Sequence, residues 1–365
     1  MMKKSLIIAF VCMLLAPVAA RAGEWYEKIK LGGDFRHRYE LIQDESKDVD
    51  RSRWRMRARL MLSAKLTEEV SAGVRLATGG DDPVSTNQTM TDAFATKAFG
   101  LDLAYFTYAP RKLEGLSFTG GKMKMPFTTP GKTELIWDGD LNPEGMALQF
   151  EHALGEKVGI FVNGSWFSIV ERSSSDDTWM AGGQAGFDVK ATEDVSLMIG
   201  GSYYSYENIK GIMPLYDDSF FGNTSAVVDS ENVFANEYRI FEVLGEVGMK
   251  FDKIGVTVYG DYVNNTEADS LNTGYLFGAA VKYGKGKGAF SVYGNYRKLE
   301  ADAVLGVFTD SDFRGGGSDG SGVELGASYA LAEKVALDGT YFINKKGIED
   351  EVDYKRLQLD IQLKF

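Results

Sequence analysis

Apolar and polar residues alternate along most of the chain with a period of two, and not with the three-to-four spacing of an amphipathic helix. The last segment is the clearest case, because every second residue from Leu357 to Phe365 is apolar and the residues between them are polar. The segment 53–66 alternates in the same way, with arginines on one face over half of its length. Successive side chains of a β-strand point to opposite faces. The pattern therefore predicts an all-β chain.

The connections between these strands alternate between short turns and long polar loops. Short turns are expected at 67–69, 111–115, 153–157, 191–194, 252–254, 284–288 and 332–334. Long loops are expected at about 43–52, 79–99, 128–143, 171–178, 207–236, 265–273, 299–320 and 345–351. This arrangement predicts a transmembrane antiparallel β-barrel of about 16 strands, with short periplasmic turns and long extracellular loops. A soluble β-sandwich is the alternative, but it gives no reason for the strict alternation of short and long connections.

The first 22 residues differ from this pattern and are typical of a secretory signal peptide. Two lysines precede an apolar run over residues 6–20, and Ala20-Arg21-Ala22 provides small residues before a cleavage site. An apolar run of this length is short for a membrane-spanning helix, which needs about 20 residues. We therefore predict export, with cleavage after Ala22 and residues 23–365 forming the barrel.

Composition limits the chemistry that the chain can support. The single cysteine, Cys12, lies in the predicted signal peptide, which excludes disulfides, cysteine-ligated metals and cysteine nucleophiles from the mature protein. The two histidines, His37 and His152, are too few for most histidine-based metal sites. The formal net charge is −12, and an exported protein this acidic is not expected to bind nucleic acid, which requires clustered basic contacts. We predict no metal and no cofactor.

The end of the chain resembles a known assembly signal. Phe365 closes an alternating strand, as in the C-terminal signal of bacterial outer-membrane proteins. The whole mature chain resembles the putative porins of Gram-negative bacteria, through the basic strand 51–59, the segment 120–127 (GGKMKMPF) and the segment 137–145 (WDGDLNPEG). The resemblance implies an outer-membrane porin that passes small hydrophilic solutes or ions passively. It also implies recognition by the barrel-assembly machinery, contact with outer-membrane lipids and lipopolysaccharide, and a homotrimer.

A row of arginines is the most informative feature of the predicted lumen. If the apolar residues of 53–66 face lipid, the arginines between them face the lumen, because an arginine at mid-membrane on the lipid face costs about 2–4 kcal/mol. The hairpin of the first two strands then sets Arg38 near Arg55 and Arg36 near Arg57. Basic residues of nearby strands extend this wall. The predicted pore-lining residues are Arg36, Arg38, Arg53, Arg55, Arg57, Arg59, Arg75, Lys122 and Lys124.

Two interpretations of this basic wall remain open. Fixed positive charge sets anion selectivity in a pore, so the wall could be a track for anions. Alternatively, an acidic loop neutralises the wall and leaves an ordinary pore with a transverse field. The third long loop is the candidate, because its apolar residues 135–137 favour folding into the barrel over packing on the outer rim or on a neighbouring subunit. Its carboxylates, which are expected to oppose the arginines at a constriction, are Glu134, Asp138 and Asp140.

Other motifs lack the context that their chemistry requires. Gly315, Gly317 and Gly320 have the spacing of a dinucleotide fingerprint, but no strand-to-helix unit surrounds them, so a flexible outer loop is predicted. The segment 310–321 begins like a calcium loop but has serine where a bidentate glutamate is needed. Acidic pairs in the long loops could bridge lipopolysaccharide through divalent cations, but we interpret them as solvated. They are Asp81–Asp82, Asp176–Asp177 and Asp217–Asp218.

Other functions compete with a passive porin. A membrane-embedded hydrolase, such as an outer-membrane phospholipase, would need a Ser–His pair. His37 falls on the outward side of its strand and His152 ends a strand beside a short turn, and neither has an evident serine partner. A ligand-gated or electron-conduit barrel would need a plug domain or a haem partner, and a substrate-specific channel for phosphate-type anions is a further alternative. We predict a porin with weak anion preference and no enzymatic activity.

Overall fold

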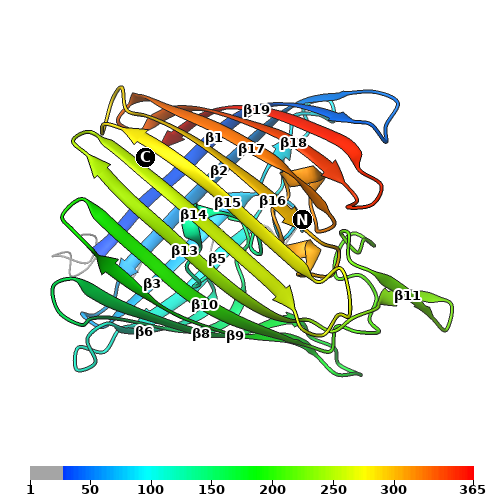
Figure 1. Cartoon of the computed structure of the whole chain (residues 1–365), viewed down its shortest axis with the longest axis horizontal. Coiled ribbons are helices and arrows are strands. Elements are labelled where there is room, and N and C mark those ends of the chain that lie inside the picture. The colour runs from blue at the N-terminus through cyan, green and yellow to red at the C-terminus, as the bar shows by residue number, and fades with distance from the viewer. Residues whose placement is uncertain (1–27) are drawn as a thin grey trace, which may run out of the picture.

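The computed structural model describes residues 28–365, which form a closed β-barrel (Figure 1). The predicted signal peptide, residues 1–22, lies outside the described residues. The barrel strands are β1 (Ile29–Asp44), β2 (Arg51–Lys65), β3 (Val70–Thr78), β5 (Phe99–Tyr108), β6 (Leu116–Lys122), β7 (Glu144–Ala153), β8 (Val158–Val170), β9 (Thr178–Lys190), β10 (Val195–Glu207), β13 (Arg239–Phe251), β14 (Ile254–Asn265), β15 (Thr273–Tyr283), β16 (Phe290–Leu299), β17 (Gly320–Ala332), β18 (Val335–Lys346) and β19 (Val352–Lys364).

Each barrel strand pairs antiparallel with its neighbours in the chain, and β1 also pairs with β19, from Asp34 opposite Lys364 to Asp44 opposite Tyr354. Because the sheet closes on itself, its first and last strands satisfy each other's N–H and C=O groups within the membrane. The predicted all-β transmembrane barrel of 16 antiparallel strands is confirmed. Within residues 28–365, no helix is long and apolar enough to cross a membrane.

The short turns lie at one end of the barrel, and the long loops 79–98, 123–143, 208–238 and 300–319 lie at the other (Figure 1). The other four connections at that end, including those expected as long loops at about 43–52 and 345–351, do not exceed the turn at 109–115 in length. Figure 1 shows a loop hairpin that reaches beyond the barrel at the loop end. The long loops contain short elements of their own. The two-residue strand β4 (Gln88–Thr89) pairs with β2, and β11 (Ser225–Val228) forms a hairpin with β12 (Glu231–Phe234). Three 3-10 turns also lie in these loops: η2 (Pro130–Lys132), η3 (Gly306–Phe308) and η4 (Phe313–Gly315).

The two faces of the barrel wall have opposite polarity. On β2, the side chain of Trp54 is 49% exposed, whereas Arg57 on the other face is 7% exposed. Large apolar side chains such as Leu148, Phe187 and Phe277 are exposed around the outside of the barrel. An apolar exterior around a polar interior is the arrangement that a barrel needs in hydrocarbon. The alternation seen in the sequence therefore separates lipid from lumen.

The main apolar core lies inside the barrel, where the connection between β6 and β7 folds inward. Leu135 and Ile136 are 1% and 3% exposed. The Trp137 ring meets the Tyr204 ring of β10 edge-on at 5.2 Å, and Phe127 meets the same ring at 4.9 Å. Burial of these apolar side chains outweighs the solvation of a free loop and holds this connection against the inner wall.

The connection between β16 and β17 also folds into the barrel, so the expectation of a flexible outer loop at 299–320 is wrong. Its Val304 and Leu305 are 0% and 1% exposed. The Asn223 amide donates to the carbonyl oxygens of Ala301 at 2.6 Å and Val304 at 2.7 Å. Gly317 has φ 95°, and a Cβ there would lie 2.2 Å from a carbonyl oxygen. These glycines therefore allow tight packing and do not mark an exposed linker.

Candidate functional site

Arginines line the inner face of the β1–β2 hairpin. The register places Arg36 opposite Arg57 and Arg38 opposite Arg55, as expected from the sequence. Like charges directly opposed across strands repel. Carboxylates on the same faces offset this repulsion. Asp34 lies opposite Arg59, accepting from its Nε at 2.8 Å and from Arg57 Nη2 at 3.1 Å.

Glu40 is the centre of the second group of charges in the lumen. Its carboxylate is fully buried, lies opposite Arg53 in the register, and accepts hydrogen bonds from Arg53 and from Arg356 of β19. Gln358 donates to the same carboxylate at 3.3 Å. A buried carboxylate is tolerated when it is paired and hydrogen-bonded in this way. Glu40 therefore ties the first, second and last strands together inside the barrel.

The third long loop contacts the arginines through only one of its three predicted carboxylates. Asp140 accepts from Arg57 Nη1 at 3.3 Å and from Arg59 Nη1 at 3.1 Å. Burial alone would raise the pKa of Asp140, but these two guanidinium groups lower it below its usual value. Asp140 therefore stays ionised and docks the loop on the basic wall.

Glu134 and Asp138 face a different partner, Asp310 of the other infolded loop. Carboxylate oxygens of the three residues lie within 4.8 Å of one another. Asp138 accepts from the main-chain N–H of Ser311 at 2.9 Å, and Glu134 accepts from that of Gly139 at 3.0 Å. Burial, and then the neighbouring carboxylates, raise the pKa of Glu134 and Asp138 well above the usual values. Carboxylate oxygens are the ligands that hard cations prefer, but clusters of acidic side chains are common without a cation.

The wall extends through the remaining predicted basic residues. Arg75 pairs with Asp102 of β5. Lys122 donates to a carboxylate oxygen of Glu144 at 2.9 Å. Lys124 donates to the carbonyl oxygen of Gly139 at 3.2 Å, and burial, followed by the nearby charge of Arg75, lowers the pKa of Lys124 to about 8. Lys122 thus bridges the two ends of the third loop, Lys124 contacts its middle, and Arg75 reaches Asn142 near its end at 3.5 Å.

Several charged residues of the lumen were not predicted from the sequence. Asp312 accepts a hydrogen bond from Arg38 Nη1 at 3.1 Å and forms an ion pair with Arg356 Nη2 at 2.6 Å. Arg297 of β16 reaches Asp310 and Glu324, both at 2.8 Å. Arg356 has the inward parity of the last strand, which was a usable signal. The two loop aspartates had none, because only the infolding of their loop brings them to the wall.

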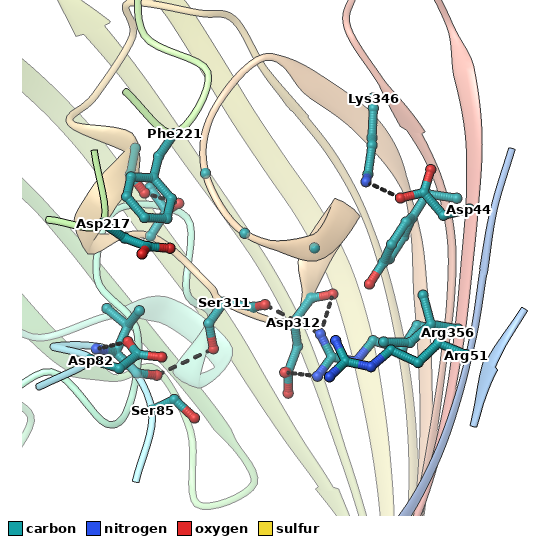
Figure 2. A pocket seen from close by; sticks show the side chains of 18 of the residues that line it. Asp44, Arg51, Asp82, Ser85, Asp217, Phe221, Ser311, Asp312, Lys346 and Arg356 are labelled. Atoms are coloured by element: carbon teal, nitrogen blue, oxygen red, sulfur yellow. Dashed lines mark hydrogen bonds and ion pairs between the residues drawn. The ribbon is translucent and has the colours of Figure 1, made fainter. Parts of the chain in front are cut away.

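Two cavities lie in the lumen on either side of these contacts. An outer cavity of about 490 Å³ is lined by β2 and by the long loops (Figure 2). An inner cavity of about 430 Å³ is lined by Arg36, Arg38 and Glu134. Asp312 lines both cavities. The group of Asp312 with its two arginines therefore stands between the two cavities, where a permeating solute would meet it.

The terminal residue and the histidines lie outside the lumen network. The main chain of Phe365 pairs with Gly33 in both directions, at 3.1 and 3.2 Å, and a Cβ on Gly33 would lie 2.6 Å from the Phe365 ring. His37 stacks on Trp54 on the outer face, with 4.9 Å between ring centroids. His152 stacks on Phe150 at 5.9 Å. This arrangement brings neither histidine to the charged groups of the lumen.

A closed 16-stranded barrel with an apolar exterior, a charged lumen and infolded loops is the architecture of outer-membrane porins. The chain belongs to the family described as "Putative porin", whose model matches residues 42–233 and 224–365. The resemblance inferred from the sequence is thus confirmed, and the bacterial outer membrane is the location of such barrels. A comparison with curated proteins finds no match.

Solved structures share the fold at low sequence identity. Pseudomonas putida OprB, in a high-pH structure, has a TM-score of 0.62 and 11% identity over 95% of this chain and 96% of its own. Salmonella typhi OmpF, solved with daunomycin, has a TM-score of 0.55 and 9% identity, with 92% and 97% covered. A Vibrio cholerae OmpT loop-deletion mutant has a TM-score of 0.53 and 12% identity, with 92% and 99% covered. Identities this low support the fold alone.

Proposed function

We propose that this porin passes small hydrophilic solutes and ions by diffusion, with a weak preference for anions. The observation that supports this proposal most strongly is the charge on the inner wall formed by β1, β2 and β19. Seven guanidinium groups there face five carboxylates. The arginines are Arg36, Arg38, Arg53, Arg55, Arg57, Arg59 and Arg356, and the carboxylates are Asp34, Glu40, Asp140, Asp312 and Asp360.

Local charge outweighs the acidic character of the whole chain in this proposal. The Debye length is about 8 Å at physiological salt, so carboxylates on the outer loops are largely screened from an ion in the lumen. Within the described residues, the buried Nε atoms of Arg36, Arg55 and Arg57 have no acceptor. The excess of positive charge is small, which supports a weak preference and not strict selectivity.

Reversal potentials in planar bilayers under a salt gradient test this proposal. Arg55→Glu with Arg57→Glu should shift the reversal potential toward cations, and Asp140→Asn should shift it toward anions. Lys253→Glu with Lys285→Glu is the matched control, because both lysines are exposed in short turns. Arg55→Gln with Arg57→Gln is a milder second variant if the glutamates impair folding. A parental reversal potential in all conducting variants would contradict the proposed role of the wall.

A substrate-specific channel for phosphate-type anions is the second candidate, and the facing arginine pairs of the basic wall, Arg36 with Arg57 and Arg38 with Arg55, are the observation that favours it. Inorganic phosphate would then interrupt the chloride current of single channels. If phosphate and chloride carry current without mutual interference, the general channel is favoured.

We also propose export by the leader, with cleavage after Ala22, assembly through Phe365, and a homotrimer. Edman sequencing of the purified barrel should begin at Gly23. Deletion of Phe365 should slow insertion and leave aggregates in the periplasm, because the assembly machinery loses its terminal aromatic residue. Unchanged amounts of heat-modifiable barrel would contradict this role. Mass photometry in detergent distinguishes a trimer from a monomer.

A further inference from the structure

The outer cavity contains charges of both signs that are not neutralised by each other. It has a volume of about 490 Å³, which lies within the roughly 300–1,000 Å³ range of small-molecule sites. Part of its charge is already paired, because Arg356 binds both Glu40 and Asp312, and Lys346 binds Asp44 at 2.5 Å. The remaining charged groups determine what this cavity can bind.

The basic pole of the cavity consists of Arg51 and Arg55 of β2. Arg51 forms no ion pair with any residue that the structure describes, and the nearest acidic oxygen to Arg55, Glu40 Oε1, is 3.9 Å away. Arg55 donates only long hydrogen bonds of 3.4 Å, to Ser85 Oγ and the carbonyl oxygen of Asn87. Both guanidinium groups therefore keep donors free for a carboxylate.

The acidic pole consists of Asp82 and Asp217, which belong to two different long loops. Neither forms an ion pair within residues 28–365, and Asp82 accepts only from the main-chain N–H of Val84 at 3.0 Å. Figure 2 shows these aspartates on one side of the cavity and Arg51 on the other. Burial raises the pKa of Asp82, and the positive charge of Arg55 partly offsets this effect. The acidic and basic poles therefore interact electrostatically.

Aromatic rings adjoin the acidic pole. The rings of Tyr216 and Phe221 stack with 6.2 Å between their centroids, and both line the cavity. An ammonium group is attracted by aromatic faces as well as by carboxylates. Gly315, Gly316 and Gly317 also line the cavity but add no side chains to it, so their part of the β16–β17 loop leaves space open. The cavity thus offers an anion-binding end and a cation-binding end with free space between them.

We propose that the outer cavity captures small zwitterions, namely α-amino acids or short peptides, with the carboxylate at Arg51 and Arg55 and the ammonium group at Asp82 and Asp217. This inference rests on the channel function proposed above, and Asp312 lines both this cavity and the inner one. A simple anion would satisfy only the basic pole and leave two carboxylates facing it. A neutral sugar would satisfy neither pole.

Single-channel recording with three dipeptides tests the two poles separately. The probes are alanyl-alanine, N-acetyl-alanyl-alanine, which lacks the ammonium group, and alanyl-alanine amide, which lacks the carboxylate. Alanyl-alanine should interrupt the current in a saturable way, with an apparent affinity about tenfold higher than either analogue, because each lost charged contact is worth roughly that factor. Glucose, a neutral solute of comparable size, should cause no saturable interruptions.

Variants assign each end of the zwitterion to its pole. Asp82→Asn with Asp217→Asn should abolish the difference between alanyl-alanine and its N-acetyl analogue. Arg51→Gln with Arg55→Gln should abolish the difference between alanyl-alanine and its amide. Asp229→Asn with Glu231→Gln, at the exposed hairpin of β11 and β12, is the matched control and should keep both differences. Heat-modifiable gel mobility shows whether each variant forms a barrel.

The outcomes distinguish the capture site from the channel itself. Salt current without selective interruption by alanyl-alanine overturns the capture site and leaves the channel function standing. Equal interruption by the N-acetyl analogue or by glucose also overturns it, in favour of an anion or a sugar site. If no salt current is seen from folded barrels, the proposed channel function fails and this inference fails with it.

Discussion

Arg38 and Asp360 lie directly opposite each other where the first and last strands close the barrel. Arg38 Nε donates to Asp360 Oδ1 and Nη2 donates to Oδ2, both at 2.7 Å, so that the two groups form a bidentate pair. They are separated by 322 positions in the sequence. Paired guanidinium and carboxylate groups are geometrically specific. The pair therefore sets the register of the closing seam from inside the lumen.

Breaking this pair should destabilise the barrel. Arg38→Gln leaves the buried Asp360 without its main partner, which costs about 3–5 kcal/mol for an isolated buried charge. Asp360→Asn should cost less, because Arg38 keeps Asp312. The double variant should be more stable than the sum of the two single effects predicts. Urea unfolding of barrels refolded into lipid vesicles measures all three, and strictly additive losses would contradict coupling at the seam.

The contact between the two infolded loops should weaken as the pH rises. Glu134 and Asp138 have a raised pKa in the folded protein, from burial first and neighbouring carboxylates second. A carboxyl whose pKa is raised on folding stabilises the folded state below its ordinary pKa, near 4, and this contribution is lost as the pH rises through the raised value. Open-channel noise should therefore increase as the pH rises through this raised value, well above 4, because the ionised carboxylates then repel and the loops separate.

Glu134→Gln with Asp138→Asn should remove much of this pH dependence. Asp310, the third carboxylate of this cluster, contributes less to the repulsion, because the ion pair with Arg297 offsets part of its charge. Glu349→Gln with Asp350→Asn, on the exposed loop before β19, is the matched control and should behave like the parent protein. Noise in the parent protein that does not change with pH would show that these carboxylates do not control the loops.

Asn223 should hold the connection between β16 and β17 inside the barrel. Its amide donates to two carbonyl oxygens of that loop, and its own carbonyl accepts from the N–H of Gly306 at 2.9 Å. Asn223→Ala leaves these buried groups unsatisfied, at about 1–3 kcal/mol each. Ala303→Cys, at a fully buried position, should then react quickly with a thiol reagent, but slowly when Asn223 is present.

The control for this labelling is Asn272→Ala. Asn272 also donates to two carbonyl oxygens, Asn265 at 3.1 Å and Ala268 at 2.7 Å, but it does so in a different loop. The Asn272→Ala substitution should therefore not change the rate at which Ala303→Cys is labelled. Fast labelling in the parent background would contradict the infolded position of this loop.

The β11–β12 hairpin should be accessible on intact cells, unlike the infolded loops. A protease site inserted after Val228 should be cleaved by added protease, since Val227 is 72% exposed at the hairpin. The same site inserted after Thr309, which is 2% exposed, should resist cleavage. Western blotting of intact cells compares the two insertions, and equal cleavage would contradict the difference in burial.

The alternation of residues determined the barrel and its two faces without any tertiary information. The pleat of a strand permits only one assignment of Trp54 and Arg55 to lipid and lumen, because their environments differ so strongly in polarity. The pairing of Arg36 with Arg57 followed from closing the hairpin of the first two strands, because consecutive antiparallel strands joined in a hairpin fix each other's register.

Only the tertiary structure decided which charges meet. Glu134 and Asp138 were expected at the arginines but lie against Asp310, because a second loop that the sequence marked as exposed folds inward. The partner of Arg38 on β19 depends on the closure of the whole barrel. The poles of the outer cavity come from separate loops and one strand. Contacts of this kind depend on how distant loops fill a common interior, and neither periodicity nor spacing encodes that packing.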